Sequence, residues 1–261
     1  MSEKLIVKKD GEIASIIFNN PKAYNSFDLE LITYVLENVE ELSKDDEIKG
    51  IIFSGEGKAF CTGGDLGWAT SWPKGPSNAF NELATVYHQV ILEIRRMPKP
   101  VIAAINGIAA GGGFSLALAC DFRIMAKSAI LKQGYTSNGL SLDGGGSFTL
   151  PRFVGLARAL EIAAFDKPIS ADQALTWGLV TKVVEDQRVI EEALDMGREL
   201  SKISLNSFKA SKNLLTDSFN TSLEAHLDNE RDFLSSCADH PDGKEGISAF
   251  KEKRKPSFNR K

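Results

Sequence analysis

The stretch KPVIAAINGIAAGGGFSLALACDFRIM, residues 99–125, passes from one apolar segment through a cluster of glycines into another. Its opening residues VIAAING predict a buried strand, and AAGGGFSLALAC predicts a helix that starts at the glycines. The residues DFRIMA then predict a second strand. Because a strand, a helix and a strand in this order form a βαβ unit, we expect an α/β fold with a mostly parallel sheet.

The same alternation extends on both sides of this unit. The segment KLIVKKDGEIASIIFNN, residues 4–20, alternates around Asp10-Gly11 and predicts an opening β-hairpin. After residue 155 the pattern is mostly helical, and LVTKVV is the one strand still predicted. Further strands are expected within residues 49–55 and 129–134, and further helices within residues 27–46 and 81–100, the last one stopped by prolines.

The last part of the chain, from about residue 189 to residue 261, has several helical stretches and no predicted strand. One of them, FNTSLEAHLDNERDFLSSC, is amphipathic, so it needs an apolar surface to pack on. Contacts between subunits would supply that surface. We therefore predict a core at residues 1–195 and a C-terminal helical oligomerisation region at residues 196–261.

The composition argues against several classes of protein. With 43% hydrophobic and 25% charged residues, the 261-residue chain is typical of globular proteins. A net charge of -4 offers no basic surface, so we expect no nucleic-acid partner. The three cysteines lack metal-ligand spacing, and no metal site is predicted. No apolar run resembles a signal peptide or a membrane span, so we expect a cytoplasmic protein with no membrane partner.

Two glycine-rich turns follow apolar strands, one in IIFSGEGKAFCTGGDL, residues 51–66, and one in residues 101–116. Free N–H groups at the start of a helix point outward with the positive end of the helix dipole. Two such turns that converge would form an oxyanion hole, worth roughly 10²–10³ in rate per donor. Taken alone, each turn is explained more simply by close packing of strand and helix. Neither turn has the pattern of a phosphate-binding loop.

Five segments carry a resemblance to a known family: NPKAYNSF (20–27), GEGKAFCTGGDL (55–66), residues 99–125, LPRFVGLARALEI (150–162) and ISADQALTWGLVTKVV (169–184). In this order and spacing they resemble the crotonase (enoyl-CoA hydratase/isomerase) superfamily. The resemblance covers nearly the whole chain and implies a crotonase-like spiral of ββα units with C-terminal helices that trimerise, as a homotrimer or a dimer of trimers. It also implies an acyl-CoA thioester substrate and no cofactor other than the CoA of the substrate.

The resemblance implies roles for individual residues as well. The two main-chain N–H groups of the oxyanion hole match Gly64 and Gly112. The CoA moiety is expected along Lys22, Ala23 and Ala59, with Asp65 and Leu66 nearby, and Phe250 and Lys253 are expected to reach a CoA, including one on a neighbouring subunit.

The resemblance fails at the two glutamates with which hydratases of this superfamily activate water. Ser115 and Tyr135 stand at these positions, and neither is a carboxylate base at neutral pH. Asp143, in LSLDGGGSFTLPR, occupies the place where some relatives have a single catalytic aspartate. This pattern, like the C-terminal residues 227–258, resembles the isomerases of phenylacetate breakdown.

A single carboxylate suits the migration of a double bond, because it can remove a proton from one carbon and return it to another. The thioester enolate formed between these steps would be held by Gly64 and Gly112. We therefore predict an enoyl-CoA isomerase with Asp143 as acid/base, in which Ser115 and Tyr135 shape the pocket or orient the substrate. Without the resemblance, the residues LDGGG predict only a turn.

His88 supports a different hypothesis. It matches a histidine of the 4-chlorobenzoyl-CoA dehalogenases, which also carry an aspartate at the position of Asp143, as a nucleophile. Their active-site tryptophan corresponds to Tyr135 here, which favours the isomerase. Three alternatives stay open: an enoyl-CoA hydratase, a hydrolase or dehalogenase of an aromatic or cyclic acyl-CoA that uses Asp143 and His88, and a non-catalytic acyl-CoA binding protein.

Other side chains have simpler interpretations. Trp68 and Trp72 are predicted either to cap an acyl pocket or to pack within a loop. Arg95 is predicted on a solvated helix face, and Cys61 and Cys120 as small buried side chains. The identity of the acyl group and the choice between trimer and hexamer are not determined by the sequence.

Overall fold

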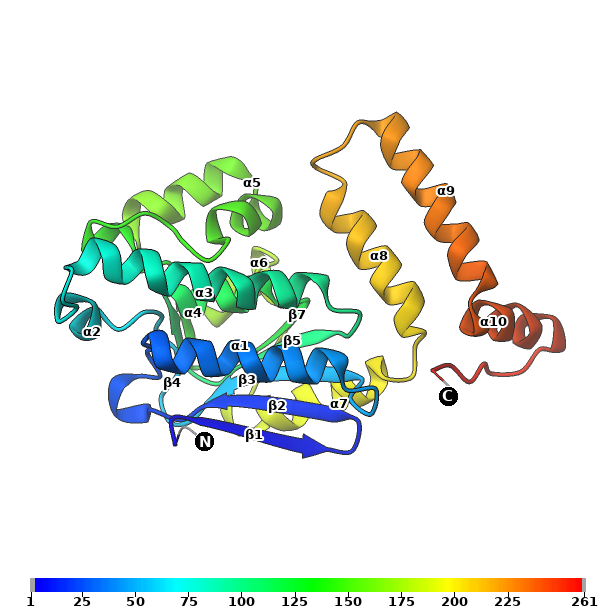
Figure 1. Cartoon of the computed structure of the whole chain (residues 1–261), viewed down its shortest axis with the longest axis horizontal. Coiled ribbons are helices and arrows are strands. Elements are labelled where there is room, and N and C mark those ends of the chain that lie inside the picture. Colours follow the sequence, from blue (N-terminus) through cyan, green and yellow to red (C-terminus); the bar gives the residue numbers. More distant parts are fainter. Residues whose placement is uncertain (1–2, 260–261) are drawn as a thin grey trace.

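The sheet that begins with the N-terminal hairpin organises the fold, as a computed structural model describing residues 3–259 shows (Figure 1). Its strand order is β1-β2-β3-β5-β7-β10, with β1 and β2 antiparallel and every later pair parallel. The predicted hairpin and the mostly parallel sheet are therefore confirmed. The strands are β1 (Leu5–Asp10), β2 (Ile13–Phe18), β3 (Gly50–Gly55), β5 (Val101–Ile105), β7 (Phe122–Ala126) and β10 (Lys182–Val184).

A second sheet of short strands has the order β4-β6-β8-β9. The strands β4, β6 and β8 each follow a strand of the larger sheet after a short connection, and each is followed by a helix. The repeating unit is therefore ββα, as predicted. The expectation that LVTKVV is the one strand after residue 155 is wrong, because β9 also lies there. These strands are β4 (Ala59–Cys61), β6 (Ile108–Ala110), β8 (Ile130–Lys132) and β9 (Ile169–Ser170).

Helices cover the sheets, and two of them show how the sequence sets their ends. Asp28 caps α1 by accepting a hydrogen bond from the N–H of Leu31 at 2.8 Å. Pro76 stands in the first turn of α3, where no backbone donor is needed, so α3 begins earlier than predicted. The helices are α1 (Leu29–Lys44), α2 (Leu66–Thr70), α3 (Pro76–Arg96), α4 (Gly112–Ala119), α5 (Gly146–Phe165), α6 (Ala171–Thr176) and α7 (Val189–Leu200), with 3₁₀ turns η1 (Pro21–Ala23), η2 (Thr136–Asn138) and η3 (Asp186–Arg188).

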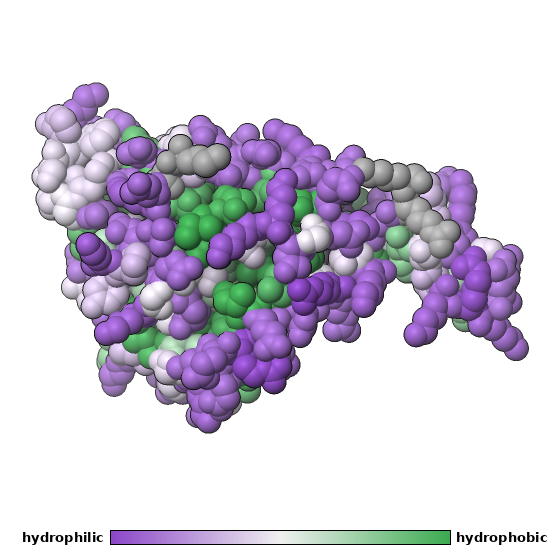
Figure 2. All heavy atoms as spheres, turned by 90° about the horizontal axis from the view of Figure 1, so that it is seen from below, coloured by the Kyte–Doolittle hydropathy of each residue, from purple (hydrophilic) through white to green (hydrophobic). Residues whose placement is uncertain are grey.

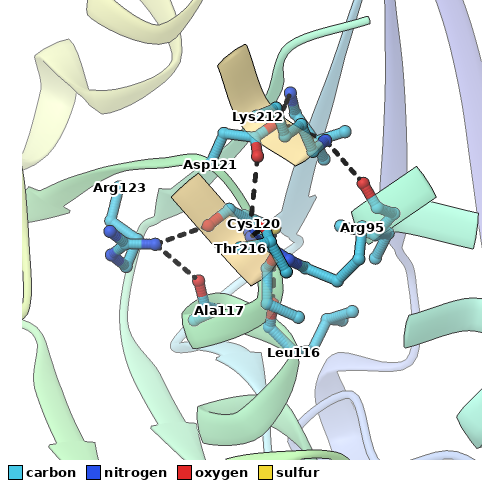
Figure 3. Close-up of polar contacts among 11 residues, drawn as sticks. Arg95, Leu116, Ala117, Cys120, Asp121, Arg123, Lys212 and Thr216 are labelled. Carbon is cyan, nitrogen blue, oxygen red and sulfur yellow. Dashed lines mark hydrogen bonds and ion pairs between the residues drawn. The ribbon is translucent and has the colours of Figure 1, made fainter. Parts of the chain in front are cut away.

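Helix α8 (Leu205–Asp217) is fastened to the core by buried charges (Figure 3). Lys212 is only 6% exposed, and its Nζ lies 2.7 Å from the carbonyl oxygen of Ile94 and 2.8 Å from Asp121 Oδ2. Burial lowers the pKa of Lys212, while Asp121 opposes that shift. Arg95 of α3 donates to the hydroxyl of Thr216 on α8, so the prediction that Arg95 lies on a solvated helix face is wrong.

Helices α9 (Leu223–Asp239) and α10 (Pro241–Glu252) stand away from the core (Figures 1 and 2). No described residue of α9 is buried. The predicted boundary after residue 195 falls inside α7, and the division into two regions stays a prediction, as do the subunit contacts. Apolar side chains that α9 and α10 leave exposed are Leu223, Leu227, Leu234, Ile247 and Phe250.

Over residues 3–259, no helix is long and apolar enough to cross a bilayer. The same residues contain no group of three histidine, cysteine, aspartate or glutamate side chains that could hold a metal ion. Cys61 and Cys120 are buried as expected, and burial raises the pKa of each thiol to about 12.

Candidate active site

A cavity of about 360 Å³ opens where the two glycine turns meet the loop that precedes α5. Aromatic and aliphatic side chains of α2 and α3 form much of its lining, which suits an apolar ligand. Asp143 is the one carboxylate among the described residues of that lining. The cavity also brings together Gly64, Gly112 and Tyr135 from three separate segments.

The two glycine turns touch one another beside the cavity. A Cβ on Gly63 would lie 2.4 Å from the amide nitrogen of Gly112, which no real contact allows. Gly63 also has φ of +86°, in the region that glycine adopts readily. The turns therefore approach as closely as they do because neither has a side chain at this point.

The N–H groups of Gly64 and Gly112 are both free of protein acceptors within residues 3–259. Phe27 pairs with the neighbours of Gly64: its N–H donates to Gly63 and its carbonyl accepts from Asp65, each at 2.9 Å. In such a parallel bridge the central residue turns its own N–H to the other side. Gly112 is the first residue of α4, where an N–H has no intrahelical partner. Two donors are thus left for a ligand oxygen.

Asp143 reaches the cavity from a turn whose backbone conformation favours glycine. Gly144 and Gly145 have φ of +60° and +74° and lead the chain into α5. A Cβ on Gly144 would lie 2.3 Å from the ring of Tyr87, so the turn sits directly against α3. The side chain of Asp143 is 37% exposed. The residues LDGGG therefore form a turn, and the same turn holds a carboxylate in the cavity wall.

His88 of α3 pairs with this carboxylate. Its Nε2 lies 2.6 Å from Asp143 Oδ1. The imidazole is 49% exposed and does not belong to the described cavity lining, whereas Asp143 does. Asp143 therefore stands between the cavity and His88, so any effect of His88 on a ligand in this cavity would pass through Asp143 or through water.

Ser115 and Tyr135 support the loop that carries Asp143. The hydroxyl of Ser115 is buried and donates to the main-chain oxygen of Asp143 at 2.7 Å. The hydroxyl of Tyr135 lies 3.4 Å from that of Ser115. Burial raises the pKa of Tyr135 above its usual range, so the phenol stays protonated at neutral pH. Tyr135 is therefore a hydrogen-bond donor at this site and not a base.

The residues predicted to hold CoA lie in different places. Leu66 lines the cavity, and Asp65 caps α2 by accepting from the N–H of Trp68 at 3.0 Å. Lys22 and Ala23, in η1, and Ala59, in β4, lie outside the described lining. Two hydrogen bonds join the segment of η1 to the segment of β4 beside the cavity. Asn25 Nδ2 donates to the carbonyl of Ala59 at 2.7 Å. The hydroxyl of Thr62, a residue of the cavity lining, donates to the carbonyl of Tyr24 at 3.1 Å.

Phe250 and Lys253 belong to α10 and its C-cap, and α10 lies at the end of the molecule opposite α2, which contributes Leu66 to the cavity (Figure 1). Phe250 is 86% exposed on α10, and Lys253 caps the C-terminus of that helix. The structure does not bring either residue to the cavity of its own chain. Their contact with a CoA bound to a neighbouring subunit stays a prediction.

Trp68 and Trp72 pack on one another, with ring centroids 4.8 Å apart. They line a separate hollow against Tyr34 of α1 and take no part in the described lining of the active-site cavity. Of the two interpretations left open by the sequence, packing within the loop is the one that agrees with the structure.

Tyr87 is the residue of this site that the sequence analysis missed. It is 2% exposed, and its hydroxyl donates to the main-chain oxygen of Gly112. Its ring centroid lies 5.1 Å from that of Phe27. The spacing from Leu83 through Tyr87 to Ile91 and Ile94 places it on the buried stripe of α3. A tyrosine on the buried stripe of a helix needs a hydrogen-bond partner for its hydroxyl, so its position in the sequence could have predicted a polar contact inside the core.

Comparison with known proteins identifies the family and the fold. The profile of a family described as "Enoyl-CoA hydratase/isomerase" matches residues 8–261. The chain is 33% identical to the 1,2-epoxyphenylacetyl-CoA isomerase of Escherichia coli (strain K12) over 100% of both proteins, and 34% identical to the crotonyl-CoA hydratase of Syntrophomonas wolfei over 98% of both. The crystal structure of an enoyl-CoA hydratase from Polaromonas sp. JS666 superposes with a TM-score of 0.90 at 35% identity, covering 97% of this chain and 99% of that one.

Proposed function

The chain belongs to the enoyl-CoA hydratase/isomerase family, and from that membership we propose that it is an enoyl-CoA isomerase with Asp143 as its acid/base. It is an acyl-CoA processing enzyme of the crotonase family. One arrangement supports the isomerase proposal: a lone carboxylate lines the same cavity as the free main-chain amides of Gly64 and Gly112.

In this proposal the two amides act on the carbonyl of the thioester. The substrate oxygen lies between the N–H groups of Gly64 and Gly112, which stabilise the negative charge that the oxygen gains in the enolate. Gly112 starts α4, so the positive end of that helix dipole favours the same charge. The amides stabilise the enolate more than the neutral thioester, which lowers the barrier to its formation.

Asp143 moves the proton. Its carboxylate removes a proton from one carbon of the acyl group, and the double bond shifts through the enolate. The protonated Asp143 is partly exposed, so its proton exchanges with solvent before the group protonates another carbon. Substrate and product have the same composition, so no second reactant is needed. His88 holds Oδ1 of the carboxylate at 2.6 Å, which orients the group and leaves Oδ2 for the substrate.

Two features count against a hydratase that works through a pair of glutamates. Ser115 and Tyr135 stand at the positions of that pair, and both are engaged in supporting the loop of Asp143. A buried phenol that stays protonated cannot take a proton from water. The two hydroxyls instead suit a role in shaping the cavity.

The contact between Asp143 and His88 favours a second candidate, the hydrolysis of an aromatic or cyclic acyl-CoA. In that reaction an oxygen of Asp143 forms a bond to the substrate ring and the ring substituent departs with its electron pair. His88 then takes a proton from the water that cleaves the new ester, which regenerates the carboxylate. The oxygen that reaches the product comes from Asp143 in the first turnover.

A panel of straight-chain, cyclic and aromatic enoyl-CoA thioesters tests the proposal. We expect at least one of them to give a product of unchanged mass in ordinary water and of increased mass in deuterium oxide. A product heavier by one water would support a hydratase instead. Solvent ¹⁸O found in Asp143 after turnover in labelled water would support the hydrolase, and either result would overturn the isomerase.

A further inference from the structure

Tyr87 contacts two of the segments to which the proposed mechanism assigns a task, and it reaches the third through Phe27. It lines the cavity from the buried face of α3. Its hydroxyl meets Gly112 at the start of α4, and its ring meets the turn after Asp143. The ring also lies beside Phe27, whose backbone pairs with Gly64. One side chain thus touches the Gly112 segment and the segment of the proposed acid/base, and it packs on the residue that pairs with Gly64.

The hydroxyl acts on the residue that carries one of the amides. Tyr87 donates to the carbonyl oxygen of Gly112, while the N–H of Gly112 is free beside the cavity. Both groups belong to one residue without a side chain, so a hydrogen bond to the carbonyl restrains the direction of the N–H. Burial raises the pKa of Tyr87 well above its usual value, so the donor stays protonated.

The ring keeps the two sides of the site apart. A Cβ on Gly144 would lie 2.3 Å from Cε1 of Tyr87, so the glycine turn and the ring are already in contact. The ring centroid is 5.1 Å from that of Phe27 on the other side. Gly144 belongs to the Asp143 turn, and the backbone of Phe27 pairs with the Gly64 segment. The tyrosine ring therefore sets the spacing between these two segments.

We propose that Tyr87 is a positioning residue that holds the Gly112 amide in register with the Asp143 carboxylate. The inference rests on the proposed isomerase mechanism. His88, the next residue of α3, holds the carboxylate itself, so one turn of α3 supports both the charge-stabilising and the proton-transferring group. Geometry of this kind matters, because a displacement of about 1 Å at a reacting centre can cost 10²-fold in rate.

The substitution Tyr87→Phe tests the role of the hydroxyl, because it keeps the ring and removes the donor. We expect kcat to fall about tenfold, less than the loss of a whole oxyanion donor, with KM within about twofold of its original value. The matched control is Tyr34→Phe, the same change on α1, away from the cavity. Tyr34→Phe should leave kcat and KM unchanged.

A second readout does not depend on turnover. A cinnamoyl-CoA thioester absorbs at longer wavelength when its carbonyl is polarised by hydrogen bonds, so its difference spectrum reports the two amides. We expect a red shift on binding to the original protein, a smaller shift with Tyr87→Phe at the same affinity, and the full shift with Tyr34→Phe. Site-specific 3-fluorotyrosine at residue 87 retains ring and hydroxyl but strengthens the donor, so it should enlarge the shift.

The outcomes separate this inference from the proposed function. If the original protein binds the thioester with no red shift and isomerises nothing, the proposed function fails. If it isomerises and shows the shift, but Tyr87→Phe retains the full shift and kcat, the role of Tyr87 is overturned. If Tyr87→Phe does not fold, an unchanged shift with 3-fluorotyrosine at residue 87 overturns it equally.

Discussion

The two walls of the active-site cavity are built by different means. The main-chain wall, formed by Gly64 and Gly112 with Gly63 behind them, owes its shape to the absence of side chains. The side-chain wall, formed by Asp143 and Tyr135 with Ser115 and His88 behind them, owes its shape to hydrogen bonds from separate segments. In the proposed mechanism the main-chain wall binds the thioester carbonyl and the side-chain wall moves the proton.

The similarity to known proteins does not choose one reaction. The chain is about equally similar to an isomerase and to a hydratase, at 33% and 34% identity over nearly the full length of each. Gly63 tolerates few substitutions, because a Cβ there would collide with the main chain of Gly112. The side-chain wall depends on individual polar contacts of Asp143. Substitutions in the two walls should therefore fail in different ways.

The largest effect is expected from Gly63→Ala in the main-chain wall. The new Cβ would lie 2.4 Å from the nitrogen of Gly112, and φ is +86°, so both turns must move. We expect activity to fall by about 10⁴-fold, since both amides are displaced, together with a lower Tm. Gly64→Ala is the matched control: its Cβ would meet only the end of the Leu83 side chain, at 2.9 Å, so Tm should hardly change. Equal Tm losses in both variants would contradict this view of the wall.

The next effect is expected from Asp143→Asn in the side-chain wall. Asparagine has almost the same shape but accepts no proton, so isomerisation should fall by about 10³-fold. The side chain is partly exposed, so Tm should stay within about 2 °C of its original value. Kinetics and thermal unfolding measure the two quantities. Turnover at the original rate would remove Asp143 from the mechanism.

A smaller effect is expected from His88→Gln. Glutamine can still donate to Asp143 Oδ1 but lacks the rigid ring, so kcat should fall about tenfold by misorientation. The pair is partly exposed, so the free energy of unfolding should change by less than about 1 kcal/mol. Loss of activity as complete as in Asp143→Asn would favour the hydrolase, in which His88 activates water.

The smallest effect is expected from Tyr135→Phe. The change removes one contact at 3.4 Å, so kcat should fall about threefold. Burial raises the pKa of Tyr135, so the phenol is protonated in the whole range below pH 9 and its loss should not alter the shape of the pH–rate profile there. A basic limb that disappears with Tyr135→Phe would show that the phenol titrates in that range and takes part in proton transfer.

The sequence contained more local signal for the main-chain wall than for the side-chain wall. Glycines after apolar strands predicted two turns that could form an oxyanion hole if they converged, and the resemblance named Gly64 and Gly112 as the pair. The side-chain wall depends on contacts such as that between His88 and Asp143, which are 55 residues apart. Only the resemblance to a known family brought these residues together, and it contained no signal for Tyr87.

The errors in the fold have similar causes. Arg95 follows the exposed spacing of an amphipathic helix, but its partner Thr216 lies 121 residues later on α8. Strand β9 has two residues, too few for a period-two pattern. Both depend on segments that are distant in the sequence, whereas the hairpin and the buried strands carry their signals within one short stretch.

The most direct test of Asp143 as the proton carrier is exchange of acyl protons in deuterium oxide. A bound enoyl-CoA is incubated with the original protein or with Asp143→Asn, at concentrations at which both are saturated, and deuterium uptake is followed by mass spectrometry. The isomerase mechanism predicts uptake with the original protein and none with Asp143→Asn. Uptake at the same rate in both would show that another group removes the proton.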